Sequence, residues 1–378
     1  MLRDKGLGTI VPNQLDMSGV RNSNRRDTEI YSHTSLRGLA ACAVVGYHAV
    51  LAHGAPGYSI ANTFFMHSYL FVDLFFILSG YIISSSYESM FRSGPLNGTA
   101  YRLFQLRRII RIYPNYVVWL AIAILTTLAI EWKNTGAVAL SSDFAVSLVM
   151  HLAMIQSLLD APIKWNLPLW SIAVEFISYL VFPILILARQ RLRWFDATAA
   201  ALTTAGLVFL WSSTTLDTIS GWTSVLRCLC GFSLGMLLAS SQPFTVLPSL
   251  WLSALQLGAL TFALVSVAVG AELAAILGFV ALVGATARND GALFTVFRRP
   301  ELHYLGRISF SIYLAHVPVL SVYLATAGFF EKRTGLPLLT DWLVMTSFVL
   351  LGSIVAASLS FALLEVRSRR WLTAKLLN

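Results

Sequence analysis

The chain contains a succession of apolar runs, each close to the ~20 residues that a helix needs to cross ~30 Å of hydrocarbon. Hydrophobic residues make up 57% of its 378 residues and charged residues only 12%, which is about half the charged fraction of a soluble domain. The predicted fold class is therefore all-α, a polytopic membrane protein with about ten transmembrane helices. The expected spans lie near 36–53, 68–90, 114–131, 167–188, 195–213, 221–240, 246–269, 271–287, 302–325 and 341–364.

Polar segments at both ends flank one predicted membrane domain. Residues 1–34 are expected to form a disordered cytoplasmic tail, and they lack the apolar run of a cleavable signal peptide. Residues 35–366 are the predicted transmembrane domain and 367–378 a basic cytoplasmic tail. The basic stretch at 189–193 would lie outside, against the positive-inside rule, if the apolar segment 143–159 crossed the membrane. We therefore expect it to be re-entrant or interfacial on the outer side.

The basic residues indicate the orientation. The chain has 27 Lys and Arg against 18 Asp and Glu, a net charge of +9. With the N-terminus in the cytoplasm, most Lys and Arg fall in or beside cytoplasmic segments, as the positive-inside rule requires. Both termini are then cytoplasmic. Because the charge is divided among many loops, a nucleic-acid surface is the less favoured interpretation.

Among the ionisable side chains inside the predicted spans, five form the candidate set. Such residues cost free energy in hydrocarbon and are functional-site hypotheses by default. From the rise of 1.5 Å per residue we place all of them in the outer half of the membrane, roughly 8–21 Å from the points where their helices enter. This shared depth predicts one polar cavity. The residues are His48, Asp73, Glu175, Arg227 and His316.

Proton transfer is the chemistry that this set supports. A histidine titrates near neutrality and takes a proton from a hydroxyl group, and a nearby carboxylate fixes its tautomer. His48 together with Asp73 or Glu175 fits that pattern. The alternative for each residue is structural, as an intramembrane ion pair or a hydrogen bond between helices. Cys228 and Cys230 are two residues apart on a helix and do not face one way, so no metal site is predicted.

A basic block, Arg107-Arg108-Ile-Ile-Arg111-Ile-Tyr-Pro114, stands at the start of the third span. Arginine forks bind phosphates in bidentate fashion, and Pro114 is expected near the first turn of the span. Arg37, at the cytoplasmic mouth of the first span, would join the same patch. The alternative is a topology anchor on anionic lipid. A phosphate site on the cytoplasmic side and a base in the outer half of the membrane together imply that a group is transferred across the membrane.

Five segments follow one another along the chain: SLRGLA (35–40) followed by His48, FVDLFFILSGY (71–81), RRIIRIYP (107–114), PLWSIAVEF (168–176) and GRISFSIYLAH (306–316). In this order they resemble the integral-membrane acyltransferase-3 family, whose bacterial members resemble lipopolysaccharide and exopolysaccharide O-acetyltransferases. The resemblance covers roughly residues 35–365. The first segment resembles the R-G-x-A…H pattern of the family, and the second its D-x-F-F-x-x-S-G-(F/Y) pattern.

The resemblance implies an acyl-CoA donor, most often acetyl-CoA, bound from the cytoplasm. It also implies a carbohydrate acceptor on a lipid-linked or periplasmic glycan. It makes His48 the catalytic histidine, with Asp73, Glu175 and His316 at matched positions. The arginines that would serve the donor are Arg37, Arg107, Arg108 and Arg111. The chain lacks the proline that often follows Glu365 in the family, so we place little weight on Glu365.

The predicted protein is an O-acyltransferase of the bacterial inner membrane that acylates a sugar of a surface or exported polysaccharide. Arg227 is a predicted substrate-binding residue, with Trp170 and Ser171. An intramembrane guanidinium favours an anion, so a succinyl group or an acidic sugar stays open as an alternative to the favoured acetyl group. The alternative function is a proton-coupled transporter or permease for a glycan or its precursor, since His, Asp and Glu also suit a proton relay. The arginine block favours the enzyme, because a simple transporter does not need it.

Overall fold

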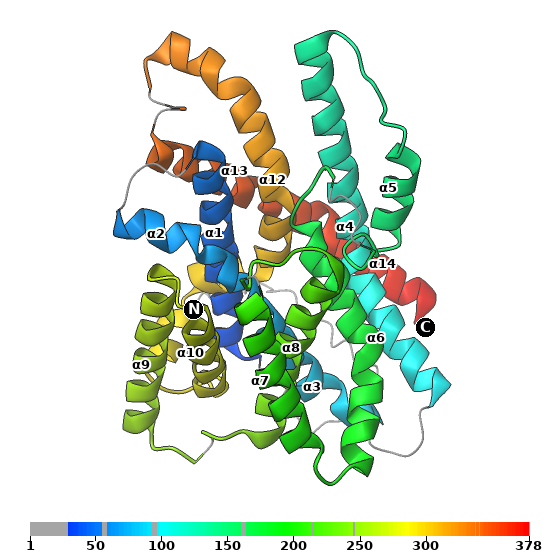
Figure 1. The fold of residues 1–378 in the computed structure, drawn as a ribbon, viewed down its shortest axis with the longest axis vertical. Coiled ribbons are helices and arrows are strands. Elements are labelled where there is room, and N and C mark those ends of the chain that lie inside the picture. Colours follow the sequence, from blue (N-terminus) through cyan, green and yellow to red (C-terminus); the bar gives the residue numbers. More distant parts are fainter. Residues whose placement is uncertain are drawn as a thin grey trace, which may run out of the picture.

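The computed structural model describes residues 29–54, 59–91, 97–159, 164–213, 215–244, 246–336, 338–339 and 341–377. Across these residues the regular structure is helical without any strand, which confirms the predicted all-α class. Figure 1 shows a bundle from which α4 and α12 extend beyond the other helices at one end. The elements are α1 Tyr31–His53, α2 Ile60–Met66, η1 Ser68–Leu70, α3 Phe71–Tyr87, η2 Glu88–Phe91, α4 Gly98–Thr135, α5 Phe144–Leu152, α6 Leu169–Arg191, α7 Phe195–Ser213, α8 Gly221–Ser241, α9 Ser249–Ala268, α10 Glu272–Ala285, α11 Ala292–Phe297, α12 Pro300–Thr334, α13 Trp342–Ser360, η3 Phe361–Glu365 and α14 Val366–Leu376.

Within the described residues, nine helices are long and apolar enough to cross a membrane. The predicted span at 271–287 is the exception, because α10 has 14 residues and a length of about 21 Å. Gln256 on α9 nevertheless donates hydrogen bonds to the carbonyls of Ala285 and Asp290. The chain after α10 is therefore back beside the first half of α9, so α9 and α10 form a hairpin.

Helix α4 corrects the prediction for the basic block. The block was expected at the start of a span with Pro114 near the first turn, but α4 is one helix of 38 residues with Pro114 inside it. At 1.5 Å per residue it is about 57 Å long, well beyond the thickness of the hydrocarbon. The hydropathy pattern missed its first half because the arginines interrupt the apolar run there.

The segments outside the predicted spans also differ in part from expectation. Helix α5 has nine residues, too few to span a membrane, which agrees with the expectation that 143–159 does not cross. Helix α1 begins at Tyr31, inside the segment assigned to the N-terminal tail, and residues 1–28 of that tail lie outside the described part. The predicted C-terminal tail is instead helix α14, which continues from α13 through the π-helical turn η3.

Glycines bring α3 and α8 into close contact. Gly231 and Gly235 on α8 are four residues apart and lie on one face of that helix. A Cβ atom on Gly235 would stand 2.0 Å from the carbonyl oxygen of Ile77, and one on Gly80 would stand 2.0 Å from that of Phe232. Small residues of this kind let membrane helices pack backbone to backbone. Gly231 faces the turn of α3 at Asp73 and Gly235 faces the next turn at Ile77, so the two helices run parallel. The crossing brings Asp73 next to Arg227.

A second glycine contact joins α1 and α12. A Cβ atom on Gly38 would stand 2.6 Å from the backbone nitrogen of Gly306. His48 follows Gly38 by ten residues, and His316 follows Gly306 by ten residues. The two histidines also meet, so α1 and α12 run parallel and in register. The contact that starts at the glycines thus sets the heights of the histidines.

Candidate active site

His48 and His316 form a direct pair. Nε2 of His316 lies 3.2 Å from Nδ1 of His48, and the ring centroids are 4.8 Å apart. Nδ1 of His48 also lies 3.0 Å from the carbonyl oxygen of Val44, which only accepts hydrogen bonds. We therefore assign the proton of the neutral His48 ring to Nδ1, which leaves a lone pair on Nε2. That nitrogen has no hydrogen-bond partner among the described residues, and His48 is only half-buried.

Asp73 and Arg227 form an ion pair at the α3–α8 crossing. The guanidinium reaches both carboxylate oxygens, with Nε to Oδ1 at 2.9 Å and Nη2 to Oδ2 at 2.6 Å. The side chains are 1% and 0% exposed. Arg227 also donates to the carbonyls of Tyr69 and Thr218. Two expectations change as a result: Asp73 does not contact His48, and the anion that Arg227 requires is Asp73.

Glu175 also lies apart from His48. Its Oε1 accepts a hydrogen bond of 2.6 Å from Tyr179, whose hydroxyl lies 3.1 Å from that of Ser79. Its electrostatic neighbour is Arg37. The depth estimate gave the height of each carboxylate along its helix but not the direction in which the helix presents it. Of the two carboxylates predicted to orient His48, the structure places neither in contact with it.

Trp170 and Ser171, at the start of α6, lie between the histidine pair and the ion pair. The hydroxyl of Ser171 is 2.8 Å from that of Tyr313, and the ring of Tyr313 lies 5.7 Å from the ring of His316. The guanidinium carbon of Arg227 lies 5.5 Å from the centre of the Trp170 ring. These contacts join His48, His316, Asp73 and Arg227 into one polar centre.

Three of the four predicted donor residues belong to a second centre, to which Arg369 adds an arginine that was not predicted. We call it the arginine cluster and define it as Arg37, Arg108, Arg111 and Arg369 with Glu175 and Glu365. Arg111 is an electrostatic neighbour of both Arg37 and Arg369. Arg108 is 4% exposed and donates to the hydroxyl of Tyr87 at 2.8 Å. Arg37 and Arg111 have no hydrogen-bond or ion-pair partner among the described residues. Arg107 has a buried Nε without a partner there, but it has no recorded contact with the cluster.

Sequence reasoning missed several of the groups at the two centres. Tyr47 donates from its hydroxyl to Asp217 at 3.2 Å, beside the ring of His48. Tyr69 donates to the buried Glu272. Asp217 lies in a loop with no motif around it, so nothing in the sequence indicated its position. The sequence analysis gave Glu365 little weight and assigned Arg369 to the C-terminal tail. Their opposite charges at i, i+4 spacing were nevertheless a usable signal of an ion pair on one helix.

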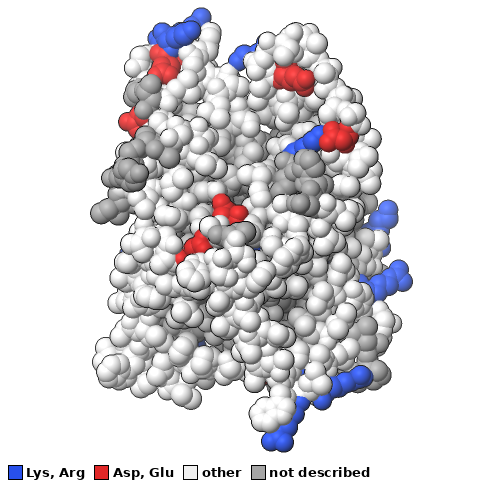
Figure 2. All heavy atoms as spheres, viewed as in Figure 1, with Lys and Arg blue, Asp and Glu red and all other residues white. Residues whose placement is uncertain are grey.

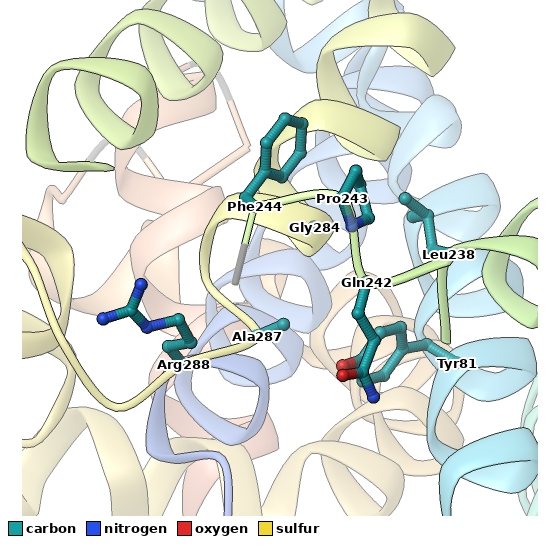
Figure 3. Close-up of a pocket in the computed structure, with 8 residues that line it drawn as sticks. All are labelled: Tyr81, Leu238, Gln242, Pro243, Phe244, Gly284, Ala287 and Arg288. Atoms are coloured by element: carbon teal, nitrogen blue, oxygen red, sulfur yellow. The ribbon is translucent and has the colours of Figure 1, made fainter. Parts of the chain in front are cut away.

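A cavity of about 160 Å³ lies at the C-terminal end of α8. Figure 3 shows Tyr81 and Gln242 side by side at one end of it, whereas Arg288 extends to the other side. A space of this size holds a few water molecules. It shares no residue with the polar centre or the arginine cluster, so it contributes nothing to the candidate site.

Comparison with known proteins supplies the family. The family model Acyl_transf_3, described as an acyltransferase domain, matches residues 30–361. The chain belongs to this family. The predictions of the family and of an enzyme of the acyltransferase class are confirmed. No solved structure was found to match the chain.

Three curated relatives match parts of the chain. An uncharacterized protein of Haemophilus influenzae is 30% identical over 128 residues, which is 32% of this chain and 51% of that protein. Peptidoglycan O-acetyltransferase OatA of Listeria monocytogenes is 28% identical over 160 residues, 40% of this chain and 23% of that protein. Acyltransferase MdmB of Streptomyces mycarofaciens is 30% identical over 168 residues, 42% of this chain and 40% of that protein. The matches thus span about half or less of each relative.

Proposed function

We propose that this member of the acyltransferase family transfers an acetyl group from cytoplasmic acetyl-CoA to a hydroxyl group of a sugar in a surface or exported polysaccharide. We also propose that it acts in the inner membrane, with both termini in the cytoplasm. The name of the Listeria relative, a peptidoglycan O-acetyltransferase, supports a sugar acceptor. The pairing of Arg227 with Asp73 supports acetyl over succinyl, since this guanidinium is already engaged and is not free for a second carboxylate.

One observation carries the proposal: α1 contributes to both centres. Arg37 in the arginine cluster and His48 in the histidine pair are 11 residues apart, about 16 Å along the helix axis. In acetyl-CoA a long pantetheine arm separates the nucleotide phosphates from the thioester. A donor with its phosphates at the arginine cluster can therefore direct its thioester along α1 toward His48. A small acyl group and a sugar hydroxyl would meet there.

In this proposal His48 is the general base. Its Nε2 takes the proton of the acceptor hydroxyl as the oxygen attacks the carbonyl carbon of the thioester. The carbon–sulfur bond then breaks, and the thiolate of CoA leaves with the electron pair and is protonated. His316 is the positioning residue, since its Nε2 accepts a hydrogen bond from the Nδ1–H group of His48 and so stabilises the imidazolium that forms. Asp73 and Arg227 hold α3 and α8 around this centre.

The proposal is tested in a deletion strain that carries variants of the gene, with mass spectrometry of the surface glycan as the measurement. His48→Gln keeps hydrogen-bonding groups but cannot act as a base near pH 7. Because a positioned base contributes about 10²–10⁴-fold in rate, acetylation should fall below detection while acetyl-CoA still binds. His303→Gln is the matched control, since His303 lies on α12 but pairs with Glu29. A well-expressed His48→Gln protein with normal acetylation would refute the role of His48.

A further inference from the structure

We infer that helix α14 is part of the donor site and that Arg369 binds the donor's phosphates together with Arg111. This inference rests on the proposed function, which places a phosphorylated donor at the arginine cluster. It assigns a binding role to the last helix of the chain, which the sequence presents only as a basic end.

The position of α14 comes from the π-helical turn η3. Helix α13 passes through Phe361–Glu365 in π conformation and continues as α14. A π turn holds about one residue more than an α turn, so it rotates everything after it by roughly 100°. Such turns inside α-helices are frequent at functional sites. Helix α14 packs against α4, and Figure 1 shows the two crossing near the C-terminus. This crossing brings Arg369 within electrostatic range of Arg108 and Arg111.

Glu365 fixes the start of α14 in the bundle. Its Oε1 accepts a hydrogen bond of 2.7 Å from Arg369, and its Oε2 accepts one of 3.2 Å from Ser311 on α12. Ser311 in turn accepts a hydrogen bond from Asn115 on α4 at 3.0 Å. Glu365 is buried, and this chain ties it to the helix that carries Arg108 and Arg111. Arg369 is thus held in a defined place next to those arginines.

The charges of the cluster do not balance. Four guanidinium groups face two carboxylates, so the cluster carries an excess of two positive charges. Nε of Arg108 and Nε of Arg369 are both buried and have no hydrogen-bond partner among the described residues. Guanidinium groups that keep unpaired N–H donors and an excess of positive charge call for an anion, and two or more phosphates satisfy both the charge and the fork geometry.

Helix α14 also provides its own controls. Arg367 and Arg370 are exposed, whereas Arg369 has a side chain that is 31% exposed and directed to Glu365. All three carry the same charge within one turn of the same helix. A general attraction to the donor, or an anchor on anionic lipid, would depend on them about equally. If α14 contributes to a phosphate site as proposed, binding depends on Arg369 and not on Arg367 or Arg370.

The experiment measures binding of acetyl-CoA to the purified full-length protein in lipid nanodiscs, at several salt concentrations. Arg369→Ala should weaken binding roughly ten- to hundredfold, because it removes charge-assisted hydrogen bonds, and should reduce its salt dependence. Arg367→Ala and Arg370→Ala should leave binding within about twofold. S-acetylpantetheine, which lacks the phosphates, should bind equally to the wild type and Arg369→Ala. If Arg369→Ala binds acetyl-CoA as well as the two controls do, the inference is wrong.

A second variant separates binding from folding. Glu365→Gln removes a negative charge and frees the guanidinium of Arg369, so acetyl-CoA should bind as tightly as in the wild type or more tightly. If the Glu365–Arg369 pair is merely structural, Glu365→Gln and Arg369→Ala should both bind acetyl-CoA more weakly, and to a similar degree. That result would overturn the inference even if Arg369→Ala folds poorly. If the wild type itself does not bind acetyl-CoA, the proposed function fails instead.

Discussion

At the scale of residues, the Asp73–Arg227 pair makes a thermodynamic prediction. Removing one member leaves the other charged and buried, which costs about 3–5 kcal/mol. Asp73→Leu and Arg227→Met should each lower the thermal midpoint of the purified protein strongly. The double variant should recover most of the loss, since it leaves no charge unpaired. Tryptophan fluorescence during heating in detergent measures this, and additive losses in the double variant would contradict the pairing.

The same residues show where sequence reasoning stops. The five ionisable residues inside spans were found because charge in hydrocarbon is rare. Their partners were not found, because depth along a helix does not fix the direction in which a side chain points. Asp73 was assigned to His48 on height alone and instead pairs with Arg227. The equal spacing from Gly38 to His48 and from Gly306 to His316 was a signal for the histidine pair.

At the scale of elements, the glycine contact between α3 and α8 should be sensitive to a single methyl group. Gly235→Ala would place a Cβ atom 2.0 Å from the carbonyl oxygen of Ile77, so the helices must separate. We expect a clear loss of thermal stability and of acetylation, because the move also disturbs Asp73 and Arg227. Gly258→Ala on α9 is the control, since a Cβ atom there meets nothing within 4 Å. That variant should be neutral or gain up to about 1 kcal/mol from helix propensity.

Helices were predictable where they face lipid along most of their length. The expected span at 195–213 coincides with α7. Helices α4 and α14 were missed in part because their arginines interrupt the apolar pattern, whether they are buried as Arg108 is or exposed as Arg367 and Arg370 are. Periodicity and hydropathy reveal a helix only through the apolar or polar surroundings of its faces. A helix that lies half in lipid and half at a charged site therefore shows an apolar run followed or preceded by a basic stretch. Only the apolar run was recognised as helix.

At the scale of the whole molecule, Figure 2 shows a face whose wide middle is mostly uncharged, with Lys and Arg at the upper end and along the lower right edge. The positive-inside rule predicts that the end of α6 is cytoplasmic and the end of α12 external. Arg191→Cys and Lys332→Cys, both at exposed positions, test this with a membrane-impermeant maleimide. In intact cells only Lys332→Cys should react. The parent protein, whose cysteines are buried or half-buried, is the control. Labelling of Arg191→Cys alone would reverse the orientation.

The parallel pairing of α1 with α12 and of α3 with α8 has a consequence for biosynthesis. Parallel neighbours cannot be joined by a short turn, so each partner emerges from the ribosome long after the first. Arg227 follows Asp73 by 154 residues and His316 follows His48 by 268 residues. At about 5–20 residues per second these intervals last roughly 8–30 and 13–54 seconds. During the first interval the carboxylate on α3 has no cation to meet, so the nascent chain must keep that helix near water or the translocation machinery until α8 arrives.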